Sequence, residues 1–141
     1  MDRPRVVLCH GVWDWIHHGH LEHLEQAKAM GDYLIVSVVA DRFAEKGRLV
    51  QDEGWRVRML QALRVVDQVV LSEAKDSPCD LLERLRPDVY VRGPDYVGQQ
   101  RPDSAVAARL GIECAFTTTV LGVSTTKLKQ EQRDLTLLLL G

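Results

Sequence analysis

The sequence predicts an α/β fold in which helices cover both faces of a parallel five-stranded sheet. Short apolar runs rich in β-branched residues alternate along the chain with amphipathic stretches, an alternation typical of βαβ units. Apolar runs of this kind also indicate strands that are buried on both faces of the sheet. The expected strands are Val6–Cys9, Tyr33–Val39, Gln68–Leu71, Val89–Val91 and Ile112–Phe116.

Apolar residues at helical spacing predict the first two connecting helices. The first carries one apolar stripe and stops at Gly31, and the second is expected over Glu53–Val66. The stripe of the first helix consists of Leu21, Leu24, Ala27 and Met30. The inner face expected for the second consists of Trp55, Met59, Leu60, Leu63 and Val66.

Capping signals predict where the remaining helices begin. Ser77 suits an N-cap and Pro78 the first helical position, so a third helix is expected to start there. A shorter helix is expected after Pro102, ending at Gly111, and Ser124 is expected to cap the last helix. The inward residues of the third helix are Leu81, Leu82 and Leu85.

Size and composition predict a single domain over residues 1–141. A chain of 141 residues with 45% hydrophobic composition is long enough and apolar enough for one core. The eighteen Lys and Arg residues are outnumbered by twenty Asp and Glu residues, and a net charge of -2 argues against a nucleic-acid partner.

Cysteine count and the N-terminal sequence predict the compartment. The three cysteines, Cys9, Cys79 and Cys114, have no C-x-x-C spacing, which argues against a disulfide framework or a zinc site. The N-terminal residues lack a signal-peptide core, and no apolar run approaches the roughly 18 residues of a membrane span. A cytoplasmic location without membrane attachment is therefore expected.

The segment GVWDWIHHGH, residues 11–20, carries the densest chemical signal. It follows the first strand, runs into the first helix and contains H-x-G-H with His17, Gly19 and His20. Free backbone N–H groups and the helix dipole favour a phosphate at such a helix start, and glycine permits its close approach. Two imidazoles there would stabilise extra charge on a phosphorus under attack. Zinc is the competing ligand for such histidines, but no Cys or H-E-x-x-H pattern supports it.

Four segments together resemble the cytidylyltransferase-like nucleotidyltransferases. GVWDWIHHGH is similar to the family's G-x-F-D-x-x-H-x-G-H signature, with Trp13 in place of the usual Phe. RVRMLQALRVVD, VRGPDY and LGVSTTKL resemble three further elements of the family in the same order, so the resemblance covers about Val6 to Gln130. Within the family, the chain resembles the adenylyltransferase domain of ADP-heptose synthases and, next, the glycerol-3-phosphate cytidylyltransferases.

The resemblance implies a Rossmann-like sheet with an NTP at its C-terminal edge and assigns roles to residues of this chain. His17 and His20 would be catalytic by contacting the triphosphate, and Lys46 would reach the α-phosphate and the attacking phosphate. Asp41, Arg56 and Arg64 would bind the phosphorylated substrate, with Arg64 matched only in the glycerol-phosphate enzymes. The nucleotide would be bound by Gly11, Val12, Trp13, Asp14, Gly19, Arg92, Gly93, Asp95, Ser124, Thr125 and Thr126.

Several of these residues also have an ordinary structural interpretation. Ser124, Thr125 and Thr126 read as a helix cap, although the same hydroxyls and N–H groups suit the β- and γ-phosphates. Gly93 and Asp95 read as a turn, and Arg56 as part of a solvated helix face. Trp13 and Trp15 suit either a reshaped substrate pocket or the core.

The predicted activity is nucleotidyl transfer from ATP or CTP to a sugar or polyol phosphate. ATP and a heptose 1-phosphate are favoured, because Thr119–Gly122 replace the R-T-E-G of the glycerol-phosphate enzymes. Mg²⁺ is expected with the NTP, held mostly by phosphates and water because no carboxylate cluster is apparent. A nucleotide-binding regulatory module without turnover is the alternative from another class, and a structural partner domain is a third.

The leucine-rich C-terminal segment predicts a homodimer. Its leucines form a run that a helix cannot bury on one face, so part of the run needs a partner surface. Enzymes of the resembled family are commonly homodimers, and a two-fold contact would cover such a patch with a copy of itself. Packing back onto the sheet, or a frayed end, is the alternative. The run consists of Leu135, Leu137, Leu138, Leu139 and Leu140.

Overall fold

The computed structural model confirms the α/β fold and its five-stranded parallel sheet. It describes the chain except residues 1–2, 46, 75–76, 119–124 and 141, and it leaves out the side chains of residues 125–128 and 140. The strands lie in the order β3-β2-β1-β4-β5. Their bounds are Val6–Gly11 for β1, Tyr33–Val39 for β2, Gln68–Ser72 for β3, Val89–Arg92 for β4 and Glu113–Phe116 for β5.

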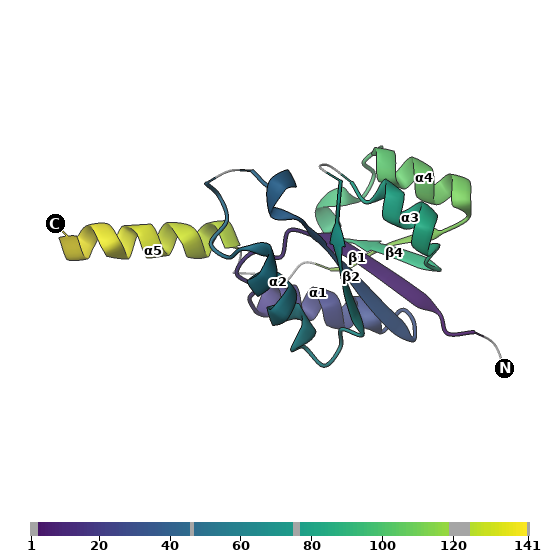
Figure 1. Cartoon of the computed structure of the whole chain (residues 1–141), viewed down its shortest axis with the longest axis horizontal. Helices are drawn as coiled ribbons and strands as arrows, with labels where there is room; N and C mark the ends of the chain where they lie inside the picture. The colour runs from purple at the N-terminus through teal and green to yellow at the C-terminus, as the bar shows by residue number, and fades with distance from the viewer. Residues whose placement is uncertain (1–2, 46, 75–76, 119–124, 141) are drawn as a thin grey trace.

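Two helices cover each face of the sheet (Figure 1). Helices α1 and α2 bury Leu24 and Leu60 on one face, whereas α3 and α4 bury Leu82 and Ala107 on the other. Their bounds are His18–Lys28 for α1, Glu53–Gln61 for α2, Cys79–Leu85 for α3 and Pro102–Leu110 for α4. Two 3-10 turns each begin one residue after a strand, η1 over Asp41–Phe43 after β2 and η2 over Pro94–Tyr96 after β4.

The strand order places the topological switch point of the sheet, at which open α/β sheets form a ligand crevice, at the carboxyl ends of β1 and β4. From β1 the chain adds β2 and β3 on one side and then returns to add β4 and β5 on the other. Connections above neighbouring strands therefore diverge between β1 and β4, which is where open α/β sheets bind ligands. The segments after these strands are residues 12–17 and 93–97.

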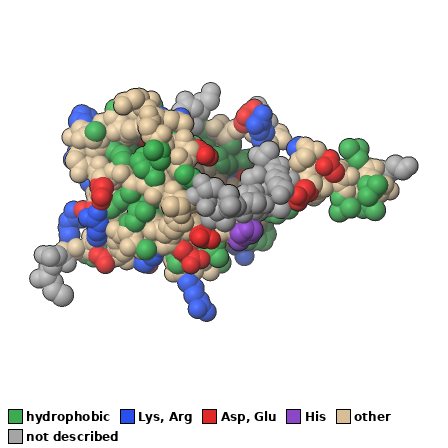
Figure 2. Space-filling model, turned by 180° about the vertical axis from the view of Figure 1, so that it is seen from behind, with side chains coloured by type: hydrophobic (Ala, Val, Ile, Leu, Met, Phe, Trp, Pro, Cys, Tyr) green, Lys and Arg blue, Asp and Glu red, His purple; other side chains and the backbone are tan. Residues whose placement is uncertain are grey.

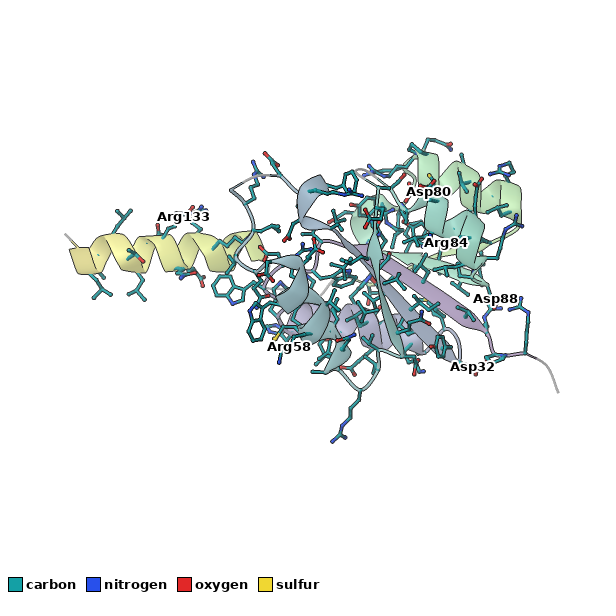
Figure 3. The ribbon with its side chains drawn as sticks, viewed as in Figure 1. Asp32, Arg58, Asp80, Arg84, Asp88 and Arg133 are labelled. Carbon is teal, nitrogen blue, oxygen red and sulfur yellow. The ribbon has the colours of Figure 1, made fainter. Side chains whose placement is uncertain are left out.

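At the opposite, amino-terminal edge of the sheet, carboxylates accept hydrogen bonds from strand amides. Asp88 accepts the Val6 N–H at 2.8 Å, and Asp67 accepts the Leu34 N–H at 2.8 Å. Val6 is the first residue of β1 and Leu34 the second of β2, so each bond satisfies a donor at the beginning of a strand. Figure 3 marks this edge with the labelled Asp32 and Asp88, on the far side of the sheet from α5.

Helix α2 differs from the prediction in its length and in its inner face. It ends at Gln61 rather than Val66, because Leu63 and Val66 form tight turns that carry the chain into β3. Trp55 and Met59, predicted to point inward, are 52% and 39% exposed. The buried residues of α2 are Arg56 and Leu60. A charged residue that bonds inside the fold therefore rotates the helix away from its apparent apolar stripe.

The predicted helix after Pro102 is confirmed, since α4 covers Pro102–Leu110 and Gly111 caps its end, whereas the predicted end of α1 and start of α3 are shifted by one or a few residues. Helix α3 has Pro78, not Ser77, at its N-cap, because the Pro78 backbone at ψ 39° is outside the helical range. Helix α1 ends before Ala29, so Gly31 does not cap it directly. A Cβ at Gly31 would lie 2.7 Å from the Arg5 carbonyl oxygen, so close backbone approach explains this glycine.

Helix α5, Thr125–Leu140, projects from the carboxyl-terminal edge of the sheet (Figure 1). The described leucines near its end are exposed by 56% at Leu135, 69% at Leu137, and 77% at Leu138 and Leu139. Figure 2 shows hydrophobic side chains gathered at this projecting end. Packing of these leucines onto the sheet is therefore not observed. No helix among the described residues is long and apolar enough to cross a membrane.

Candidate active site

The turn after β1 is held in an uncommon backbone conformation. Trp13 and Trp15 adopt φ values of 59° and 56°, a region that bulky residues enter only when the surroundings enforce it. The buried Trp13 indole donates to the Ser37 carbonyl at 3.0 Å, and the Trp15 N–H donates to the Gln51 side chain at 3.1 Å. Core packing thus accounts for Trp13, and the turn directs the side chain of Asp14 inward.

Asp14 joins this turn to two segments that are distant in sequence. Its carboxylate accepts the N–H groups of Val50 and Gln51 at 2.9 Å each. It also pairs with the Lys129 ammonium of α5 at 2.7 Å. Burial alone would raise the pKa of Asp14, but these hydrogen bonds outweigh burial and hold the pKa below its usual value. Asp14 is therefore a carboxylate at neutral pH.

His17 and His20 form a capping box at the start of α1. The His17 side chain accepts the Gly19 N–H at 3.0 Å, and the His17 N–H donates to the Nδ1 of His20 at 3.2 Å. The two ring centroids are 4.1 Å apart. The prediction placed these residues at a helix start, and the structure adds that each ring is oriented by a backbone donor.

These hydrogen bonds determine the tautomer of both imidazoles. Since each Nδ1 accepts a hydrogen bond from a backbone amide, Nε2 carries the ring proton in the neutral form. Burial, with a smaller effect of His17 and His23, lowers the pKa of His20 to about 4. Burial and the neighbouring His18 also lower the pKa of His17. Without ligand, both rings are neutral donors at pH 7.

The segment after β4 forms the second side of the crevice. Arg92 bonds to the Asp103 carboxylate and to the Tyr90 hydroxyl, and its guanidinium stacks 3.8 Å from the centroid of the Tyr96 ring. Gly93 precedes η2, where Asp95 is exposed. The predicted nucleotide residues Arg92, Gly93 and Asp95 therefore lie at the carboxyl edge, beside the segment after β1.

Two further histidines reach this edge without having been predicted as site residues. His10, at the end of β1, contacts the Ser37 hydroxyl through Nδ1 at 2.8 Å, and His23 contacts the Thr117 hydroxyl at 2.6 Å. Burial, followed by the positive charge of Arg92, lowers the pKa of His10 to about 4. The same two causes lower the pKa of His23. The sequence signal for His10 was a polar residue at the end of an apolar run, whereas His23 lies within α1, where no local pattern marked it.

Arg56, predicted to bind substrate, instead lies inside the fold. Its side chain is fully buried, and it donates to the carbonyls of Val12 and Val39 at 2.7 Å and to that of Gln51 at 3.1 Å. It also pairs with Asp41 at 2.6 Å. Arg56 is thus neither a solvated helix residue nor a donor facing the crevice. It fastens the segments after β1 and β2 to α2.

The other predicted substrate residues are separated from one another. Asp41 follows β2 at the carboxyl edge and is partly exposed, so it remains a prediction. Arg64 is exposed in the turn between α2 and β3, three residues before Asp67, which bonds at the amino-terminal edge. Because α2 runs antiparallel to the strands, this turn lies at the amino-terminal edge of the sheet, whereas His17 lies at the carboxyl-terminal edge. The structure therefore removes Arg64 from the site.

Some predicted residues lie partly or wholly outside the described part of the chain. Lys46 and Ser124 are not described, and Thr125 and Thr126 are described only as backbone at the start of α5. Gly11 is the last residue of β1 and Val12 the first of the following turn, and a Cβ at Gly11 would lie 3.0 Å from the Trp13 ring. Among the described residues, no group of three His, Cys, Asp or Glu side chains is arranged to hold a metal.

Comparison with known proteins identifies a family and several relatives. The family described as Cytidylyltransferase-like matches residues 8–131. The bifunctional protein HldE of Azorhizobium caulinodans is 37% identical over 133 residues, which cover 92% of this chain and 28% of that protein. The HldE of Gluconobacter oxydans is 38% identical over 128 residues, covering 88% and 26%. The chain thus spans little more than a quarter of the length of these relatives.

A solved structure has the same fold. The lipopolysaccharide core biosynthesis protein from Thermoplasma volcanium superposes with a TM-score of 0.71 over 84% of this chain and 99% of that one. Its sequence identity is 24%, so the likeness concerns the fold alone.

Replacing Arg56 by Met is expected to reduce the free energy of unfolding by about 3–5 kcal/mol, because it leaves the buried carbonyls and Asp41 without their partner. Denaturant titration measures this loss. The matched control is Arg58→Met, two residues further along α2 on its exposed side. The Arg58 guanidinium stacks on Trp55, and its loss should reduce the free energy of unfolding by less than about 1 kcal/mol. Equal losses in the two variants would contradict the structural role of Arg56.

The low pKa values of the half-buried His10 and His20 predict that the free energy of unfolding falls in mildly acidic solution. The folded-state pKa of about 4 for His10 and His20 is below the ordinary 6.5, so the unfolded chain binds more protons between these values. Stability is therefore full above about pH 6.5 and declines towards about pH 4. His10→Gln should flatten part of this decline in denaturant titrations, whereas His18→Gln, at an exposed position, should not. A decline that is identical in the wild type and His10→Gln would refute the assignment to His10.

Proposed function

This chain belongs to the cytidylyltransferase-like family, and we propose that it transfers the nucleoside monophosphate of an NTP to a sugar phosphate. The observation that carries the proposal is the His17–His20 pair at the start of α1, beside the crevice between β1 and β4. Two neutral imidazoles with protons on Nε2, next to the N–H groups of a helix start, form a set of donors for a polyphosphate.

The proposed reaction is a direct displacement at the α-phosphorus. An oxygen of the acceptor phosphate forms the new bond to the α-phosphorus, the bond from that phosphorus to the bridging oxygen breaks, and pyrophosphate leaves. His17 and His20 donate hydrogen bonds to oxygens that gain charge in the transition state. An approaching polyanion raises the pKa of both rings, which strengthens them as donors during the reaction.

Mg²⁺ is proposed to accompany the triphosphate. It neutralises charge on the phosphates when bound. The described residues offer no dedicated set of ligands, and Asp14 is engaged by two amides and Lys129, so phosphate and water oxygens would hold most of the ion. Lys46, Ser124, Thr125 and Thr126 retain their predicted contacts with the phosphates as part of this proposal.

ATP and a heptose 1-phosphate are the proposed substrates. Support comes from the 37% identity with a bifunctional protein HldE over nearly the whole chain and from the lack of the R-T-E-G element. A cytidylyltransferase acting on glycerol 3-phosphate or another polyol phosphate is the alternative. A regulatory module without turnover is less well supported, because the His17–His20 pair keeps an ordered donor geometry. Location in the cytoplasm stays a prediction of the sequence.

We also propose that the chain forms a homodimer through α5. Its described leucines are more than half exposed, and they occur on several sides of the helix end. Such an apolar surface is unfavourable in water and is covered in an assembly. A second copy offers the same surface, and a two-fold contact brings the two together.

Alanine at His17 or at His20 is expected to lower kcat about 100- to 1,000-fold, the usual cost of one lost transition-state donor. The assay measures pyrophosphate release with ATP, Mg²⁺ and heptose 1-phosphate, followed by the other NTPs and a panel of polyol phosphates. His18→Ala is the matched control, because His18 lies between the pair in sequence and is exposed. Near-normal turnover in both His17→Ala and His20→Ala would overturn their catalytic role.

Truncation after Gln132 is expected to convert a dimer to a monomer, since it removes the exposed leucines. Light scattering on both proteins at equal concentration makes the comparison. Unfolding curves verify that the truncated domain stays folded. A full-length monomer, or a dimer that survives truncation, would rule out α5 as the interface.

A further inference from the structure

Lys129 bonds α5 to the turn after β1 and to the loop before α2. Its ammonium lies 2.7 Å from the Asp14 carboxylate and 2.6 Å from the carbonyl oxygen of Arg48. Asp14 in turn accepts the amides of Val50 and Gln51. The ammonium therefore contacts the same loop twice, once directly and once through Asp14.

The pair is sheltered from water, so the loss of one partner costs more than at a surface ion pair. The Asp14 side chain is 5% exposed and that of Lys129 is 22% exposed. A carboxylate buried to this extent requires donors, and an ammonium supplies a charge-assisted hydrogen bond. In the middle of α5, by contrast, Arg133 lies on an exposed stretch of the helix (Figure 3).

The segments that Lys129 joins carry separate parts of the proposed phosphate site. In the sequence, Lys46 comes two residues before Arg48. Helix α5 begins at Thr125, one turn before Lys129. Asp14 lies three residues before His17, in the turn that leads to α1. One ammonium thus connects the turn that leads to α1, the loop of residues 47–51 and helix α5.

We propose that Lys129 is a positioning residue for NTP binding, which holds the loop of residues 47–51 and the start of α5 in one arrangement through Asp14. The proposal rests on the proposed nucleotidyl transfer. Lys129 does not contact the reacting atoms; it reduces the ordering that the NTP must otherwise impose on these segments. Its loss should therefore weaken NTP binding more than it slows the bound complex.

The test compares Lys129→Met, Lys129→Arg and the control Arg133→Met. Because a hydrogen bond to a charged group is lost, Lys129→Met should speed amide exchange at Val50 and Gln51 about tenfold and raise the KM for the NTP about tenfold. The kcat should stay within about threefold. Lys129→Arg, which keeps a donor for Asp14, should restore most of both effects, and Arg133→Met should change neither.

Amide exchange separates this proposal from the proposed function. Unchanged exchange at Val50 and Gln51 in Lys129→Met overturns the positioning role even when the wild type is active. Faster exchange with an unchanged KM in an active enzyme overturns the link to NTP binding. A wild type without turnover refutes the proposed function, and with it the link to NTP binding, whereas the exchange data still decide whether Lys129 orders the loop.

Discussion

The buried carboxylate of Asp14 is the constraint on which the rest of the site depends. An ionised carboxylate that is almost removed from water must find donors, and Asp14 finds them in two loop amides and one ammonium. Meeting this requirement brings together the turn after β1, the loop before α2 and the start of α5. The left-handed conformations of Trp13 and Trp15 allow the side chain to reach these donors.

The topology then concentrates anion-binding capacity at one edge of the sheet. Parallel strands all end there, and α1 starts there with two oriented imidazoles. Buried Arg56 supports the same edge from within by bonding carbonyls of the segments after β1 and β2. At the opposite edge Asp88 accepts the Val6 amide at the start of β1, and Asp67 accepts the Leu34 amide near the start of β2. The fold thus separates an edge that is closed by its own carboxylates from one that presents donors to a ligand.

Local sequence patterns predicted most of the fold and the centre of the site. The strands were found because parallel strands buried on both faces must be continuous apolar runs, and β2 matches its predicted bounds of Tyr33–Val39. His17 and His20 were found because a helix start and its ligands lie within a few residues of each other. The capping box that orients the two rings is equally local.

Interactions between distant residues were not predictable in the same way. The prediction for α2 counted apolar residues and missed that Arg56 points inward, since its partners at Val12 and Val39 belong to other segments. Lys129 and Asp14 are separated by 115 positions, so no local pattern connects them. His10 and Ser37 become neighbours only through the pairing of β1 with β2.

The central claim is that an acceptor phosphate attacks the α-phosphorus of an NTP held at the His17–His20 pair. Mass spectrometry of products formed from ATP and heptose 1-phosphate with ¹⁸O in its phosphate tests this claim most directly. The account predicts that all the ¹⁸O stays in the sugar nucleotide and that the pyrophosphate is unlabelled, because the acceptor oxygen becomes the new bridge. Labelled pyrophosphate would contradict the account, as would the absence of a sugar nucleotide with every NTP and phosphorylated acceptor supplied.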